Sequence, residues 1–187
     1  MSSVSQRRRQ RAVAARLLLS LHVDGNLDDP QIWNWDAVDR LPMWCLDEAT
    51  RRREVQLVCG ALLLSPEIRF WIKQPLLLGL QQLLGPAVFV QVIEHADVME
   101  LPREPLSGLM KQSAIDLPTA GVVELESLLM AAGSTVLNAT VHESLPRDTL
   151  VASLGQGIGN ITESAAIALL DAAIALLQAS QEEEAVA

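Results

Sequence analysis

The sequence has no tyrosine, only two cysteines and few aromatic residues, and these shortages narrow the possible folds. Four Trp and two Phe make up the 3% aromatic content, whereas 50% of the residues are hydrophobic, most of them Leu and Ala. Strands favour aromatic and β-branched residues, while Leu and Ala favour helices. The hydrophobic share also excludes a disordered chain. We therefore expect an all-α fold, a compact multi-helix domain of roughly 8–10 helices without a sheet.

The small number of cysteines and histidines excludes the common metal sites. Cys45 and Cys59 form no C-x-x-C pair, and the three histidines, at positions 22, 95 and 142, show no ligand spacing. Nothing in the sequence indicates secretion, so we expect two buried thiols rather than a disulfide. The sequence predicts no metal and no cofactor.

The charge is uneven along the chain, whose net charge is −9. Residues 1–53 carry nine Arg against seven Asp and Glu, a balance of +2, and residues 54–187 carry five Lys and Arg against sixteen acids, a balance of −11. An acidic body repels phosphate backbones, which disfavours general nucleic-acid binding. Only the arginine-rich residues 7–16 keep open the alternative of a helical DNA-binding regulator.

Two segments of the sequence bear on whether the protein contacts or spans a membrane. Residues 1–23 are expected to form a basic amphipathic helix, which begins in solvent or touches acidic lipid headgroups. Residues 74–93 are uncharged and long enough to span a bilayer, but Gly85-Pro86 breaks them in the middle. The sequence predicts two buried helices joined by a tight turn, in a protein that is water-soluble and at most peripheral to a membrane.

Breaks in the hydrophobic pattern divide the chain into segments. We predict the basic helix at 1–23, an N-terminal helical subdomain at 24–97, a proline-containing connection at 98–105, a C-terminal helical subdomain at 106–180 and a frayed acidic tail at 181–187. Within them, we expect one helix over 43–64, a new helix capped by Ser65 ahead of Pro66, and separate helices at 106–113, 119–132, 135–144 and 147–154. Asn160 and Glu163 are expected to cap the last helix.

No motif predicts an enzyme. The glycines of residues 155–159 lack the lysine and hydroxyl residue of a phosphate-binding loop, and their surroundings are helical, so a helix end and a turn are expected there. Glu94, His95 and Asp97 are the only histidine and carboxylate groups close in sequence, and neighbours on a helix point in different directions. An enzyme that uses these three groups is the weakest of the functional hypotheses.

Three of the four tryptophans, Trp33, Trp35 and Trp44, fall in one short loop-rich segment. Grouped aromatic residues either plug the end of a helical bundle or anchor a protein partner, since Trp is frequent among binding hot spots. Both interpretations remain open, and the three residues are the candidate partner-binding site.

Residues 41–97 resemble the SctK family, accessory proteins of the cytoplasmic sorting platform of bacterial type III secretion systems. The resemblance is carried by Leu41-Pro42-x-Trp44, by the apolar stretch of residues 55–64, by Glu67-Ile68-Arg69 and by two leucine- and glutamine-rich stretches, residues 80–84 and 90–95.

The resemblance implies a non-enzymatic helical adaptor in the cytoplasm, peripheral to the inner membrane through the secretion apparatus. Its implied partners are the cytoplasmic domain of the inner-membrane ring protein and the pod protein of the sorting platform. It implies no catalytic residue. The acidic balance of residues 54–187 adds the expectation of no nucleic-acid partner.

Overall fold

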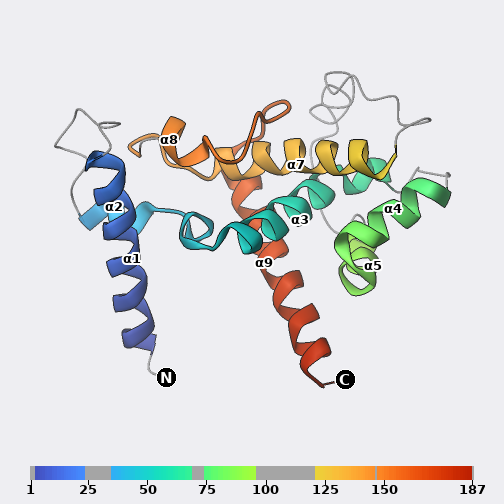
Figure 1. Ribbon diagram of the computed structural model, residues 1–187, viewed down its shortest axis with the longest axis horizontal. Coiled ribbons are helices and arrows are strands. Elements are labelled where there is room, and N and C mark those ends of the chain that lie inside the picture. Colours follow the sequence, from blue (N-terminus) through green and yellow to red (C-terminus); the bar gives the residue numbers. More distant parts are fainter. Residues whose placement is uncertain (1–2, 24–34, 69–73, 96–120, 146, 187) are drawn as a thin grey trace. The chain divides into compact units, whose positions relative to one another are not determined.

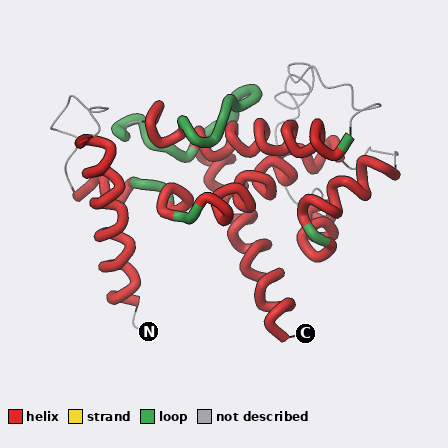
Figure 2. The backbone as a smooth tube through the Cα atoms, in the orientation of Figure 1, coloured by secondary structure: helices red, strands yellow, loops and turns green. Residues whose placement is uncertain are grey.

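A computed structural model describes residues 3–23, 35–68, 74–95, 121–145 and 147–186. Within these ranges the chain forms helices, turns and short loops and contains no strand (Figures 1 and 2), so the predicted all-α class is confirmed. The elements are α1 (Ser3–Val23), α2 (Trp35–Arg40), the 3₁₀ helix η2 (Met43–Leu46), α3 (Ala49–Ile68), α4 (Gln74–Leu84), α5 (Pro86–His95), α7 (Val122–Ala139), α8 (Arg147–Val151) and α9 (Glu163–Val186). The helix expected at 106–113 and the connection expected at 98–105 lie outside the described residues.

The chain folds into two compact units that alternate along the sequence. Unit 1 comprises residues up to 52 together with 141–153, and unit 2 comprises residues 53–140 together with the chain from 154 onward. Unit 1 therefore holds α1, α2, η2 and α8, while unit 2 holds most of α3 and all of α4, α5, α7 and α9.

Unit 2 is built around the crossing of α3 and α7. Every residue of α3 from Val55 to Ser65 is buried, as expected for a helix whose apolar residues surround its axis. The two backbones touch at glycines: a Cβ on Gly60 would overlap the Leu129 carbonyl, and a Cβ on Gly133 would overlap the Gln56 carbonyl. Only glycine permits this approach at either position.

A buried polar network lies one turn from this crossing. The Gln56 side-chain amide lies 2.9 Å from the Met130 carbonyl, from the Ser134 hydroxyl and from the Leu154 carbonyl, all within reach of its two N–H groups. The Ser134 hydroxyl in turn donates to the Leu154 carbonyl at 2.6 Å. Because buried polar groups are costly when unpaired, this network accounts for a glutamine that is only 2% exposed.

Two helix boundaries differ from the sequence-based expectation. Ser65 does not cap a new helix, because α3 continues through Pro66 to Ile68. Proline cannot donate to the Leu62 carbonyl four residues earlier, and the Ser65 hydroxyl supplies that bond at 2.8 Å. The expected helix over 43–64 likewise divides into η2 and α3, with Asp47 in an extended conformation between them.

The helices expected at 119–132 and 135–144 are one helix, α7, which runs through Gly133-Ser134-Thr135. These small residues favour breaks in isolation, but here all three are buried. The close crossing and the Gln56 network stabilise the helical conformation, so tertiary packing overrides local propensity.

The remaining helices of unit 2 complete its core. As predicted, α4 and α5 form a helix pair bent by 114° at the break between them, where Gly85 has a φ of 79°. In α4, Leu76 and Leu80 are buried, while α5 packs against α9. An apolar stripe of α9 is also buried, at Ala166, Leu169, Leu170, Ala173 and Leu177.

The ends of α9 differ from the prediction. The Thr162 hydroxyl, 3.4 Å from the Ala165 N–H, occupies the capping position that was assigned to Asn160. At the other end the helix continues to Val186 where fraying was expected, in keeping with the high helix propensity of glutamate.

In unit 1, α1 packs against α2 and η2. Trp44 of η2 is 1% exposed, and Ala14 of α1 is buried as well. The Arg52 guanidinium joins the sequence-distant parts of the unit, since it donates to the Asp47 carbonyl at 3.0 Å and to the Ser153 hydroxyl at 3.1 Å. These contacts hold η2 in place and so position the candidate site.

Candidate protein-interaction surface

The three tryptophans that define the candidate site have different environments. Trp44 is 1% exposed in η2, whereas Trp35, the first residue of α2, is 67% exposed. Trp33 lies outside the described residues. Of the two roles left open by the sequence, burial places Trp44 in the core, and exposure leaves the ring of Trp35 available to a partner.

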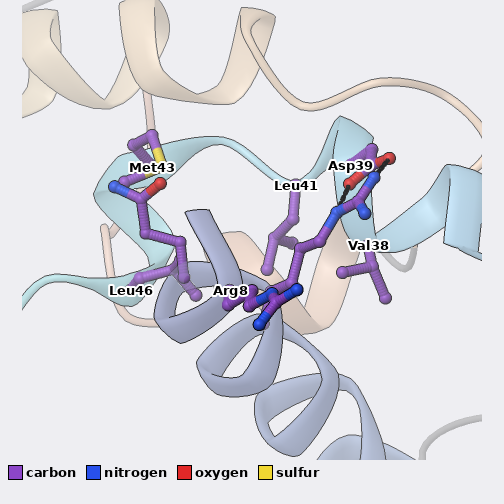
Figure 3. Close-up of a pocket in the computed structure, with 9 residues that line it drawn as sticks. Arg8, Val38, Asp39, Leu41, Met43 and Leu46 are labelled. Atoms are coloured by element: carbon purple, nitrogen blue, oxygen red, sulfur yellow. Dashed lines mark hydrogen bonds and ion pairs between the residues drawn. The ribbon is translucent and has the colours of Figure 1, made fainter. Parts of the chain in front are cut away.

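A pocket of about 550 Å³ lies in unit 1, where the first half of α1 meets α2 and η2 (Figure 3). We call its apolar lining residues the floor, and its exposed charged residues, Arg8, Arg11 and Asp39, the rim. The lining residues are Arg8, Gln10, Arg11, Ala14, Val38, Asp39, Leu41, Met43 and Leu46. Leu41 and Val38 are buried, while Met43 is 45% exposed.

The charged groups of the rim are unequally paired. The Arg11 Nε donates to Asp39 Oδ1 at 2.7 Å, and a second guanidinium N–H donates to Asp39 Oδ2. The hydrogen bond from Arg11 lowers the pKa of the Asp39 carboxyl, so this acid stays ionised and engaged. Arg8, by contrast, forms no ion pair with any described residue.

The whole of α1 is cationic. It carries five Arg, three of them at residues 7–9, and no Asp or Glu. Beyond the Arg11 pair, its exposed surface mixes charged and apolar side chains: Arg9 and Arg16 are exposed, and so are Val13 at 45% and Leu19 at 53%. Such a surface offers both charge and apolar area to a partner.

Sequence analysis did not identify the pocket residues Arg8, Leu41 and Met43 as one site. The arginine-rich start and the Leu41-Pro42-Met43 stretch were both visible, but they are separated by more than 30 residues. No helical period relates positions so far apart. The absence of any acid from α1 is the one sequence feature that points to this surface.

The groups considered for enzymatic chemistry do not form a site within the described residues. Glu94 is exposed on α5, while the side chain of His95 and all of Asp97 lie outside the described part of the chain. The His142 Nδ1 lies 2.8 Å from the Ser144 hydroxyl, two residues along the chain, and also accepts from the Ser144 N–H. Across the described ranges no three His, Cys, Asp or Glu side chains are grouped as metal ligands would be.

The glycine loop of residues 155–159 is bound to α7. The Thr135 hydroxyl donates to the Ile158 carbonyl at 2.7 Å and accepts from the Ile158 N–H at the same distance. A Cβ on Gly157 would meet the Thr135 hydroxyl at 2.9 Å. This loop therefore uses its backbone for packing, and no helix begins where a phosphate group would need one.

Both cysteines are free and buried. Burial raises the pKa of the Cys45 thiol to about 12 and raises that of Cys59 as well. A thiol that stays protonated is a poor nucleophile, so the environment of each sulfur is that of a small core residue.

Two described helices, α7 and α9, are long and apolar enough to cross a bilayer, and the bent α4–α5 pair adds a third segment if counted as one span. These helices meet the requirement by length and composition only. Half of α7 is buried within the protein, where its contacts with α3 include the glycine crossing and the Gln56 network.

Comparison of the chain with protein-family models, curated proteins and solved structures returned no match.

Proposed function

We propose that this protein is a non-enzymatic adaptor of a bacterial type III secretion sorting platform, which links the cytoplasmic domain of the inner-membrane ring protein to the pod protein. The observation that carries the proposal is the resemblance of residues 41–97 to the SctK family. These residues include α3, α4 and α5, which supply much of the core of unit 2, and η2 of unit 1 with its buried Trp44. The adaptor would act in the cytoplasm and reach the inner membrane through the secretion apparatus.

The surface of unit 1 supports an interaction role. Trp35 projects from α2 at 67% exposure, and large exposed aromatic side chains contribute disproportionately to protein interfaces. The acidic balance of residues 54–187 would in addition favour encounter with basic partner surfaces, since charge complementarity governs association rate and selectivity.

A binding experiment with purified components tests the proposal. The chain is immobilised and offered the ring protein's cytoplasmic domain and the pod protein, singly and together. We expect each to bind and the chain to hold both in one complex. Trp35→Ala should weaken binding to at least one partner, whereas Val123→Ala, an equally exposed position of unit 2, should not. If neither protein binds, the proposal is wrong.

The cationic α1 favours one alternative, a helical DNA-binding regulator. Exposed Arg8, Arg9 and Arg16 on a helix without acids would contact phosphates, although Arg11 is engaged by Asp39. Phosphate contacts release counterions, so DNA binding through α1 would weaken steeply with salt. A mobility-shift titration from low to physiological salt distinguishes the two functions, because the adaptor proposal predicts no shift at either.

A further inference from the structure

The pocket of unit 1 has unsatisfied charge of one sign. Asp39, the one acid among the described residues that line it, accepts two hydrogen bonds from Arg11, and Arg8, one turn earlier on α1, has no ion-pair partner among the described residues (Figure 3). A guanidinium binds a carboxylate through two parallel N–H···O bonds, the strongest contact this rim can offer. A ligand of this pocket would therefore carry a carboxylate at the Arg8 side.

The apolar floor of the pocket favours a ligand that carries an apolar group close to that carboxylate. Leu41, Met43 and Leu46 line the same pocket as Arg8, and Met43 leaves 45% of its area in solvent. Methionine and leucine surfaces adapt to aliphatic and aromatic side chains, and covering them removes apolar area from water. At about 550 Å³, the pocket has room for one bulky side chain together with the acidic neighbour that accompanies it.

The arrangement favours a protein ligand over a membrane or a nucleic acid. A helix that inserts into the lipid interface separates a polar face from an apolar face, whereas α1 exposes Arg9, Val13 and Arg16 together. A phosphate backbone would satisfy Arg8 but would leave Met43 uncovered. An acidic peptide segment supplies both groups.

We propose that the unit 1 pocket binds an acidic segment of a partner protein, in which an Asp or Glu pairs with Arg8 and a neighbouring bulky apolar side chain packs on Leu41, Met43 and Leu46. The inference rests on the proposed adaptor function, since it specifies the chemistry that one partner presents to unit 1.

Peptide display on the full-length chain tests the inference without the ring or pod protein. A random 12-residue library is selected in parallel on the natural sequence and on Arg8→Glu. We expect the peptides selected only by the natural sequence to be enriched, relative to the input library, in Asp or Glu within four residues of Leu, Ile, Met or Phe. Selection of the same peptides by both proteins, or of no acidic peptide, would overturn the inference.

Affinity measurements then separate the pocket from general attraction to α1. For the most enriched peptide, fluorescence anisotropy at 150 mM salt should give a Kd at least about tenfold higher for Arg8→Glu and for Met43→Asp. Arg16→Glu makes the same charge change on the same exposed helix outside the pocket, and it should change the Kd less than about twofold. Equal losses in Arg8→Glu and Arg16→Glu would refute a specific pocket, and far-UV circular dichroism confirms that each variant is folded.

Two further outcomes identify other occupants. Vesicles containing 30% anionic lipid should not compete with the peptide, and competition by them would replace the peptide interpretation with lipid binding. Association of the chain with itself at the same concentrations, abolished by Arg8→Glu, would identify a second copy as the occupant.

If Arg8→Glu still captures the ring and pod proteins and no peptide motif emerges, only this inference fails. If the motif emerges and neither protein binds, only the proposed function fails.

Discussion

The crossing of α3 and α7 predicts that a single methyl group will destabilise unit 2. A Cβ added at Gly60 meets the backbone carbonyl group of Leu129 and the backbone nitrogen of Gly133, which cannot rotate away as a side chain can. Gly60→Ala therefore requires the two helices to separate. Overpacking of this kind costs about 1–3 kcal/mol, and obstruction by backbone places the cost at the upper end.

Two further effects modify this cost. Separation of the helices would stretch the bonds from Gln56 to Met130 and Ser134, one turn away, at about 1 kcal/mol for each bond weakened. Alanine in turn favours the helical state over glycine by up to about 1 kcal/mol. The net expectation is a loss of about 2–4 kcal/mol in the free energy of unfolding, or about 5–15 °C in Tm for a protein of this size.

Urea denaturation followed by circular dichroism at 222 nm measures the effect, and Gly79→Ala is the matched control. Gly79 also lies within a helix, but a Cβ there meets only the Val122 and Leu125 side chains, at 3.3 and 3.4 Å. Small rotations of those side chains accommodate it, so Gly79→Ala should stay within about 1 kcal/mol of the natural sequence.

A reciprocal variant checks the geometry. Gly133→Ala should be destabilising like Gly60→Ala, and the double variant should cost less than the sum, because helices already separated by one methyl group meet less obstruction from the second. The reasoning would be refuted if Gly60→Ala unfolded at the same urea concentration as the natural sequence or at a higher one.

Three other predictions follow from burial. Trp44→Ala should lower the free energy of unfolding by about 3–5 kcal/mol, because Trp44 is buried. Trp35→Ala, at a 67% exposed position, should change it by less than about 0.5 kcal/mol. Equal effects of the two substitutions in thermal melts would contradict the assignment of Trp44 to the core and Trp35 to the surface. Gln56→Leu should lower the free energy of unfolding by about 1–2 kcal/mol, because the Met130 and Leu154 carbonyls each lose the amide donor while the Ser134 hydroxyl still donates to the Leu154 carbonyl. A variant as stable as the natural sequence in urea would show that water replaces the amide. Cys45 and Cys59 should react slowly with a thiol reagent at pH 8 in the folded protein and faster in urea, since burial shields each thiol and raises its pKa above the ordinary value, which lowers the thiolate fraction. Rapid labelling of the folded chain, detected by mass spectrometry, would refute this.

Helical periodicity located most helices within a few residues, and its errors fall at boundaries that individual side-chain or tertiary contacts determine. Pro66 favours a new helix by local rules, but the Ser65 hydroxyl takes over the hydrogen bond that proline cannot make. Gly133 favours a break in α7, but the crossing with α3 requires a residue without a side chain there. In both cases the contact that determines the structure is not part of the hydrophobic periodicity on which the prediction was based.

The candidate site was only partly predictable for a similar reason. Composition drew attention to the tryptophans, yet nothing local distinguishes Trp44, which is buried in η2, from Trp35, which is exposed on α2. Likewise, the Arg11–Asp39 pair joins α1 to α2, and this pairing leaves Arg8 as the pocket's charge without an ion-pair partner among the described residues.

The sequence by itself determined the all-α class and the positions of most helices, because Leu and Ala in a helical period specify local structure without reference to the rest of the chain. It also determined the cationic character of residues 1–23. Only the tertiary structure decided which backbones approach at Gly60 and Gly133, how the chain alternates between two units, and which side chains surround the pocket. These features depend on contacts between residues that are distant in the chain, and such contacts leave no periodic pattern in the sequence.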